Sequence, residues 1–407
     1  MTQLTRRDWV LTAPAVMAGL GALAAQAGSA PARVADVELW PVRATERTIW
    51  LFVRLRTDAG LSGWGEASDA FSFANTTKQQ AQQMESELRG FAALMKGRSP
   101  LDIQYYRQQG RPRAAQGGLL VATAFSAIEQ ALWDLSGQLL QMPVYQFFGG
   151  KVRDLLPVYA NINRVAKPRT PAGFAASAKQ AVAEGFRALK LAPFDGFKRE
   201  QYERPAMAPP VTEGIACVAA VRAAVGADVQ LMVDAHSLFD VPLALEVAAR
   251  LEPYNLTWYE EPVAPGRTAE TLTIRRAVKQ PMAGGEILFG TAGFAPLCRE
   301  RAVHVIMPDA KHCGGLLEMS RIAAIAEVDD VVVSPHNPSG PVATAATVQL
   351  CAGLSNFGIL ELQWGEVSWR GELLSPPEKF AAGQIAVPSQ PGFGFRFNEA
   401  LARRHSL

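Results

Sequence analysis

Two short apolar runs decide the fold class of this chain: VQLMVDAH at residues 229–236 and LTWYEEP at residues 256–262. Each run is too short for a helix, and a segment of helical character separates them. Strands that alternate with helices call for parallel pairing, because a parallel neighbour can be reached only through a long crossover. Each run also ends in ionisable residues.

Six more runs of this kind occur, and helical segments separate them: LLPVYANIN (155–163), RALKLAP (187–193), PMAGGE (281–286), VHVIMPDA (303–310), VVVSPH (331–336) and ILELQW (359–364). Eight such units fit a closed α/β barrel, whose active site lies where the strands end. An open doubly wound sheet would also alternate, but no glycine-rich dinucleotide loop follows these strands. We therefore predict a barrel domain over residues 155–361.

Six consecutive barrel strands are expected to end in an ionisable residue: Asp234, Glu260, Glu286, Asp309, His336 and Glu361. Five unpaired carboxylates in one barrel mouth would raise one another's pKa and destabilise the fold. A hard divalent cation relieves this repulsion, because carboxylate oxygens are the ligands that Mg²⁺ takes. Separate, solvated loop carboxylates are the alternative interpretation, but six strand ends in a row favour a metal site.

The part of the chain before the barrel has a different pattern. VADVELWPVR (34–43) and TIWLFVRLRT (48–57) alternate like strands, and the third short strand or turn contains GWGE at residues 63–66. Residues 76–97 and 122–140 then carry helical patterns. We predict an α+β capping domain over residues 33–154, with residues 362–407 returning to it as a C-terminal tail.

The first thirty residues have the features of an export signal. Arg6 and Arg7 precede an uncharged stretch, residues 9–32, and Ala25-Gln26-Ala27 offers a small-x-small cleavage site. Paired arginines before a mildly apolar segment are typical of a twin-arginine signal. We therefore predict a cleaved signal peptide over residues 1–30 and a periplasmic protein. An uncleaved anchor is the alternative, and a leader that does not function would leave the protein cytoplasmic.

The composition excludes several classes of partner. Hydrophobic residues make up 49% of the 407 residues and charged residues 19%, which is typical of a globular protein with a large core. The net charge is +2 and no long basic run occurs, so we expect neither a nucleic-acid partner nor, after signal removal, a membrane partner. The four cysteines lack metal-site or redox spacing. We expect buried thiols, although export would permit a disulfide.

In their order and spacing, these strand-end residues resemble the enolase superfamily, in its mandelate racemase/muconate lactonizing enzyme branch, and within it the acid-sugar dehydratases of the galactonate type. The resemblance covers the whole chain after the leader, including the GWGE turn. It implies a modified (β/α)7β barrel with an N-terminal α+β capping domain that the C-terminal tail completes. It also implies a homo-oligomer.

The resemblance assigns a metal site and a base. It implies that Asp234, Glu260 and Glu286 bind one Mg²⁺, whereas the neighbouring Glu261 does not bind the metal and is structural. Asp309 would pair with His336, because a carboxylate can hold an imidazole in one tautomer and raise its basicity. His336 would then remove the proton α to the substrate carboxylate.

Two further residues would act on the intermediate and the leaving group. Glu361 would donate a hydrogen bond to the enediolate if a crowded site kept its carboxyl neutral, and an ordinary salt-bridge partner is the alternative. His236, two residues past Asp234, should point back into the mouth. In similar dehydratases a histidine at this place is the general acid that protonates the departing 3-hydroxyl.

The strand at residues 187–193 distinguishes dehydration from racemisation. Racemases of the family commonly carry a second lysine two residues after the first, whereas here Ala192 follows Lys190. The resemblance therefore favours dehydration, and Lys190 would contact the substrate carboxylate or balance the charge of the metal site. Arg164 and Asn337 would face the substrate, and His312 would support the site.

The sequence thus predicts a Mg²⁺-dependent dehydratase that converts a sugar acid into a 2-keto-3-deoxy acid. An epimerase, racemase or cycloisomerase using the same enolate chemistry is the first alternative, and a non-catalytic periplasmic sugar-acid binder is the second. An insertion at residues 194–213 follows the strand that carries Lys190, is long for a loop of this kind, and would border the substrate.

Overall fold

The computed structural model describes residues 32–68 and 76–407. The predicted signal peptide at residues 1–30 lies outside the described residues, so export remains a prediction. Within the described part, no helix is long and apolar enough to cross a membrane. The four cysteines are all free and buried, as expected: Cys217, Cys298, Cys313 and Cys351.

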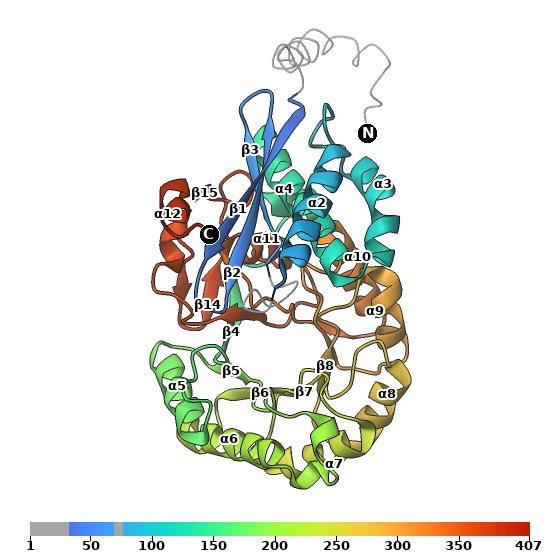
Figure 1. Cartoon of the computed structure of the whole chain (residues 1–407), viewed down its shortest axis with the longest axis vertical. Helices are drawn as coiled ribbons and strands as arrows, with labels where there is room; N and C mark the ends of the chain where they lie inside the picture. Colours follow the sequence, from blue (N-terminus) through green and yellow to red (C-terminus); the bar gives the residue numbers. More distant parts are fainter. Residues whose placement is uncertain (1–31, 69–75) are drawn as a thin grey trace, which may run out of the picture.

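The N-terminal part is a three-stranded antiparallel sheet backed by helices, at the top of Figure 1. Its elements are β1 (Val34–Arg43), β2 (Ile49–Thr57), β3 (Ser62–Glu66), α2 (Lys78–Ala93), α3 (Ile103–Gln116), α4 (Gly118–Leu139) and the 3-10 helix η3 (Val144–Phe148). The GWGE sequence explains how β3 lies against α4. A Cβ atom added at Gly63 or Gly65 would come within 2.4 or 2.0 Å of a carbonyl oxygen of α4, so only glycine permits this approach.

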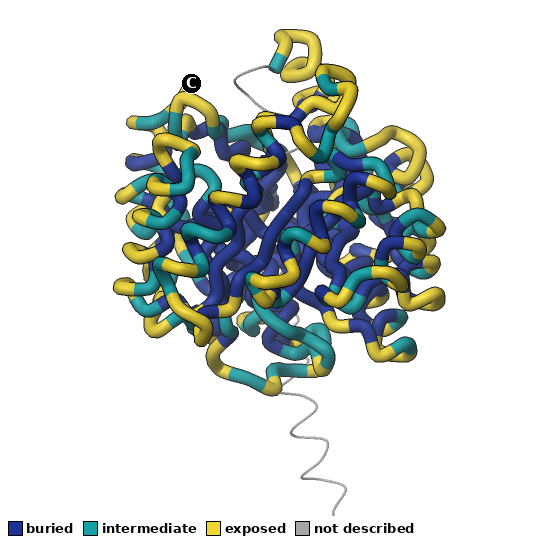
Figure 2. The backbone as a smooth tube through the Cα atoms, turned by 90° about the horizontal axis from the view of Figure 1, so that it is seen from below, coloured by how far each residue is buried: buried dark blue, intermediate teal, exposed yellow. Residues whose placement is uncertain are grey.

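Within residues 155–363, all of which the structure describes, eight strands alternate with seven α-helices. The strands are β4 (Leu155–Asn161), β5 (Ala188–Leu191), β6 (Gln230–Asp234), β7 (Trp258–Glu260), β8 (Met282–Gly284), β9 (Val305–Ile306), β10 (Val332–Val333) and β11 (Leu360–Gln363). The helices are α5 (Pro171–Ala183), α6 (Pro209–Val225), α7 (Val241–Leu251), α8 (Thr268–Ala277), α9 (Gly290–Arg299), α10 (Gly315–Val328) and α11 (Pro341–Cys351). The strands form the buried centre, and exposed residues lie on the outer helices (Figure 2).

The strands pair in parallel in chain order from β4 to β10, and β11 pairs with β4. Between β10 and β11 the ring is closed by backbone hydrogen bonds, among them Gly358 N to Val333 O at 2.9 Å. The fold is therefore the (β/α)7β barrel with a capping domain. Three of the six ionisable residues lie beyond their strands rather than at the last strand position, namely Glu286, Asp309 and His336, and Glu361 lies within β11.

The C-terminal segment packs against both parts. Its strands are β12 (Leu374–Ser375), β13 (Phe380–Ala381), β14 (Gln384–Ala386) and β15 (Arg396–Phe397), followed by α12 (Glu399–Arg404), and the 3-10 helix η7 (Arg370–Leu373) precedes them. The hairpin strand β14 pairs antiparallel with β4 of the barrel. Phe397 stacks on Trp64 of the cap with ring centroids 4.0 Å apart, which ties the chain end to the GWGE strand.

Buried carboxylates of the cap contact the N-termini of two barrel helices. Glu66 accepts hydrogen bonds of 2.7 and 2.9 Å from backbone N–H groups at the start of α11. Glu129 accepts bonds of 2.7 and 3.0 Å from backbone N–H groups at the start of α10. Carboxylates at helix N-termini satisfy orphan donors and complement the helix dipole. These contacts hold the cap over the barrel mouth.

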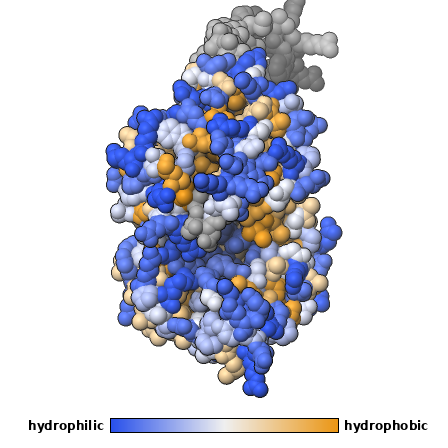
Figure 3. Space-filling model, in the orientation of Figure 1, coloured by the Kyte–Doolittle hydropathy of each residue, from blue (hydrophilic) through white to orange (hydrophobic). Residues whose placement is uncertain are grey.

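The surface agrees with the mixed composition. On the face shown in Figure 3, hydrophilic residues prevail and apolar residues form separated patches.

Candidate active site

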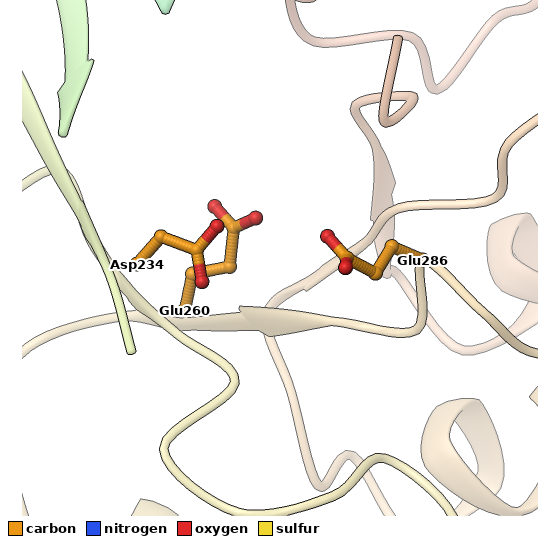
Figure 4. A group of neighbouring side chains, drawn as sticks. All are labelled: Asp234, Glu260 and Glu286. Atoms are coloured by element: carbon orange, nitrogen blue, oxygen red, sulfur yellow. The ribbon is translucent and has the colours of Figure 1, made fainter. Parts of the chain in front are cut away.

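Three carboxylates from neighbouring strands share one space at the barrel mouth. Asp234 and Glu260 are the last residues of β6 and β7 and stand opposite each other in the parallel register. Glu286 follows the end of β8. Each residue offers one oxygen, and these oxygens lie within 4.8 Å of one another, so the side chains converge in Figure 4. The structure therefore brings together the three residues that were predicted to bind a metal.

The donor set of this triad fits a divalent cation. Asp234 Oδ2 and Glu286 Oε2 are buried and have no hydrogen-bond partner among the described residues. His236 Nε2 lies 3.1 Å and Lys190 Nζ 3.5 Å from Asp234 Oδ2, but without hydrogen-bond geometry. Buried polar atoms without partners are unfavourable. Since all three ligands are carboxylates, a hard cation such as Mg²⁺ suits them.

Lys190 lies beneath the triad and is itself buried. Its Nζ donates to Glu260 Oε1 at 2.8 Å, and it lies 3.1 Å from Glu361 Oε1. Burial would lower the pKa of Lys190, but Glu260 and Glu361 hold it well above its usual range. The ammonium group therefore offsets part of the negative charge of the mouth, as one of the two predicted roles requires.

His336 is held by Asp309 on one side and faces the triad on the other. Its Nδ1 lies 2.8 Å from Asp309 Oδ2, and its Nε2 lies 3.3 Å from Glu286 Oε2. Burial alone would lower the pKa of His336, but Glu286 and Asp309 outweigh it and raise the pKa to about 9. The expected pairing with Asp309 is thus present, and Nε2 is the ring nitrogen directed toward the metal site.

His236 lies at the opposite end of the triad. Its backbone has a positive φ of 47°, and its N–H donates to Asp234 Oδ1 at 2.9 Å. This turn at the end of β6 brings the imidazole back over the mouth, with Nε2 3.1 Å from Asp234 Oδ2. The Asp234 carboxylate is the main cause that raises the pKa of His236 to about 12.

Glu361 is surrounded by hydrogen-bond donors. Its carboxylate accepts hydrogen bonds from Asn161 Nδ2 at 2.7 Å and from the Asn337 backbone N–H at 3.0 Å. Burial would raise the pKa of Glu361, but Lys190 and His336 outweigh it and lower the pKa. These contacts and the lowered pKa favour an ionised acceptor, the salt-bridge partner that was the alternative, over a neutral hydrogen-bond donor.

Three further predicted residues, Glu261, Asn337 and His312, form hydrogen bonds with other parts of the protein. Glu261 is buried and accepts from Ser237 Oγ at 3.1 Å and from the Gly285 N–H at 2.7 Å, in line with a structural role. Asn337 is also buried, and its Nδ2 donates to the Glu361 carbonyl at 3.0 Å rather than facing the cavity. His312 Nδ1 is 2.8 Å from Thr123 Oγ1 of the cap.

A cavity of about 220 Å³ lies between the barrel mouth and the cap. Its lining includes both predicted acid–base histidines, Asp234, Glu286, Lys190 and Arg164. Arg164 is paired with the buried Glu366 at 3.0 Å. The cap adds Arg47 and Leu119 to the lining. Larger or more apolar cavities lie elsewhere, under the C-terminal segment, away from this chemistry.

Two residues of the site were not identified from the sequence. Asp195, in the predicted insertion, has Oδ1 2.6 Å from His236 Nδ1. Lys311, which is fully buried, donates its Nζ to Asp309 Oδ2 at 2.9 Å. The only signal for Asp195 was the length of its segment, and the only signal for Lys311 was its place two residues after Asp309.

Both parts of the chain match known families. Residues 32–149 match the mandelate racemase / muconate lactonizing enzyme N-terminal domain, and residues 173–401 match the family described as enolase C-terminal domain-like. The chain is 30% identical over 367 residues to a D-galactonate dehydratase of Ralstonia nicotianae, which covers 88% of this chain and 91% of the relative. It is 33% identical to a D-gluconate dehydratase of Thermoproteus tenax, over 87% of this chain and 69% of the relative.

Solved structures show the same likeness. A mandelate racemase/muconate lactonizing enzyme from Sulfitobacter sp. is 30% identical with a TM-score of 0.83, covering 92% of this chain and 96% of the other. One from Jannaschia sp. CCS1 is 26% identical with a TM-score of 0.82, covering 92% of this chain and 98% of the other.

Proposed function

Because the chain belongs to the mandelate racemase/muconate lactonizing enzyme branch of the enolase superfamily, we propose that it is a Mg²⁺-dependent dehydratase of acid sugars. The observation that carries this proposal is that His236 and His336 line the same cavity and lie on either side of the carboxylate triad. One histidine suits proton removal and the other suits protonation of a leaving group. Relatives named as galactonate, gluconate and xylonate dehydratases support the substrate class.

The proton α to a carboxylate is weakly acidic, because its loss leaves a dianionic enediolate. Asp234, Glu260 and Glu286 would hold the cation, which supplies positive charge where this negative charge develops. Lys190 adds a buried ammonium within 3.5 Å of Asp234 and 2.8 Å of Glu260. Preorganised charges of this kind act strongly in a site that excludes water.

His336 is the proposed base. Glu286 is the largest cause that raises the pKa of His336, and a cation held by Glu286 would offset this charge and favour the unprotonated imidazole. The Nδ1 of His336 is engaged by Asp309, so Nε2 takes the α-proton, and the C–H electron pair moves into the substrate to give the enediolate. Asp309 in turn receives Lys311 Nζ at 2.9 Å and the Lys311 backbone N–H at 2.7 Å, which fix its orientation.

His236 is the proposed acid. As the enediolate collapses, the electron pair forms the C2–C3 double bond and the C3–O bond breaks. A proton from His236 Nε2 joins the departing hydroxyl, so that one water leaves. The resulting enol takes a proton at C3, loses the proton of its 2-hydroxyl and becomes the 2-keto-3-deoxy acid. No step needs an oxidant or a second substrate.

The test is a substrate screen with an oxo-acid readout. The full chain with Mg²⁺ is incubated with individual C5 and C6 sugar acids, and 2-oxo acid formation is followed by carbonyl derivatisation. We expect one or a few acids to react, and we expect EDTA to abolish the reaction and added Mg²⁺ to restore it. An acid that changes configuration without forming an oxo acid would identify an epimerase instead. Binding without conversion across all acids would support the binder.

A further inference from the structure

We infer that Asp195, on the segment between β5 and α6, is a positioning residue that fixes the imidazole of His236, and that Arg169 holds Asp195 in place. This inference rests on the proposed role of His236 as the acid and deepens it. It gives a role to the segment that follows Lys190, which the family chemistry described above does not use.

One carboxylate bridges the two partners. Asp195 Oδ1 lies 2.6 Å from His236 Nδ1, and Asp195 Oδ2 lies 2.8 Å from Arg169 Nη2. Charge-assisted hydrogen bonds of this length are short and directional. Because Nδ1 is occupied by Asp195, Nε2 is the nitrogen left to face Asp234 and the cavity.

Arg169 is itself anchored to the barrel. Its guanidinium donates to the Ala192 carbonyl at 2.6 Å and to the Asn163 carbonyl at 2.8 Å, which follow β5 and β4. It also lies over the Phe174 ring, 5.2 Å from the centroid. The chain of contacts therefore runs from two strand ends through Arg169 and Asp195 to His236.

His236 needs such a support, unlike His336. The His336 side chain is 12% exposed, whereas that of His236 is 38% exposed. Packing therefore restricts the His236 ring less, and removal of Asp195 leaves its Nδ1 without that acceptor. A ring that turns away from the cavity can no longer deliver a proton to the 3-hydroxyl, because proton transfer requires hydrogen-bond reach.

Measuring α-proton exchange and loss of water separately distinguishes a positioning role of Asp195 from a general structural role. In D₂O, His336 exchanges the α-proton for deuterium, while water loss also requires His236. We expect Asp195→Ala to slow dehydration by about 10- to 100-fold and to change KM little. We expect α-proton exchange to continue at nearly the wild-type rate, so that exchange relative to water loss increases. Asp195→Asn, which keeps a side-chain oxygen as acceptor, should recover part of the dehydration rate.

The matched control is Arg199→Met. Arg199 lies on the same segment and pairs with Asp240 at 3.2 Å, at an exposed position that does not contact His236. Arg199→Met should leave the rates of α-proton exchange and of dehydration unchanged. Full dehydration in Asp195→Ala, or an equal loss of exchange and dehydration, would overturn this inference alone. A wild-type chain that dehydrates no acid sugar would overturn the proposed function and this inference with it.

Discussion

The Nδ1 of His336 lies 2.8 Å from the Oδ2 of Asp309, although the two residues follow different strands of the barrel. The same oxygen receives Lys311 Nζ at 2.9 Å. The dyad therefore has a fixed geometry, which directs the opposite nitrogen of the imidazole toward Glu286 and the cavity.

Replacement of His336 tests this dyad. We expect His336→Asn to lose dehydration and α-proton exchange together, each by about 10²- to 10⁴-fold, because the base acts before the two reactions diverge. Rates from proton NMR in D₂O, with circular dichroism to confirm folding, measure this. The control is His405→Asn, since His405 stacks on Trp369 in the C-terminal segment, away from the cavity. Exchange that survives in His336→Asn would show that another group is the base.

The carboxylate triad predicts a metal affinity that one substitution can remove. We expect Glu286→Gln to weaken Mg²⁺ binding by more than about tenfold, because an amide replaces one of three anionic ligands. Isothermal titration calorimetry measures the affinity. Glu261→Gln is the matched control, since Glu261 neighbours the triad but its oxygen serves backbone N–H groups. Equal affinities in the wild type and in Glu286→Gln would contradict this metal site.

Metal binding should also stabilise the folded chain. The triad exists only in the native barrel, so Mg²⁺ at 100 times its Kd should add about 2.7 kcal/mol to the free energy of unfolding. In a thermal unfolding experiment, EDTA should reverse this stabilisation. Mg²⁺ should stabilise Glu286→Gln less than it stabilises the wild type. A melting temperature that does not change when Mg²⁺ is added would exclude the triad as a metal site.

Arg107 of α3 holds the cap to the barrel. It is buried, ion-pairs with Glu318 of α10, donates to the Gly314 carbonyl at 2.9 Å and lies 3.7 Å from Glu129. Arg107→Met removes the buried cation that Glu129 and Glu318 share and leaves Glu318 with only the partly exposed Arg111 and Arg321. We expect it to lower the free energy of unfolding by about 3–5 kcal/mol. Urea unfolding measures this. Arg89→Met removes a half-exposed ion pair of α2 and should change stability by less than about 1 kcal/mol. Similar losses of stability in the two variants would contradict this role of Arg107.

Asp134 of α4 gives a pH dependence to stability. Burial raises the pKa of Asp134 from 3.8 to about 6, although three hydrogen-bond donors oppose the shift. The folded chain therefore holds this proton more tightly than the unfolded chain. The resulting stabilisation is complete below about pH 4 and is lost as the pH rises to about 6, and its size is about 3 kcal/mol.

Asp134→Asn should remove this contribution, so the variant's stability should fall less than that of the wild type between pH 4 and pH 6. Urea unfolding at several pH values measures the difference. Parallel pH profiles for the two proteins would show that Asp134 does not titrate in this range.

The barrel could be predicted because its buried parallel strands are short apolar runs between helices, and their chemistry lies where each strand ends. Helix α3 was not predicted, because Gly110 and Pro112 interrupt its pattern and it buries Arg107 among apolar neighbours. Only the folded structure supplies the carboxylates of Glu129 and Glu318 that make such burial possible.

The active site, too, could be predicted only in part. The carboxylates at the strand ends predict a metal site, and the resemblance to the enolase superfamily assigns the triad and the dyad. The lowered pKa of Glu361 instead depends on Lys190, which lies on a strand far away in the sequence. The contact between Asp195 and His236 depends on the path of the segment after β5, and no local pattern encodes that path.

The most direct test of acid-sugar dehydration is proton NMR of the full chain in D₂O with Mg²⁺ and pooled C5 and C6 sugar acids. We expect one acid to lose its α-proton signal and a deuterated C3 methylene signal of a 2-keto-3-deoxy acid to appear. Loss of the α-proton signal without any new deoxy signal would contradict dehydration and identify enolisation without loss of water.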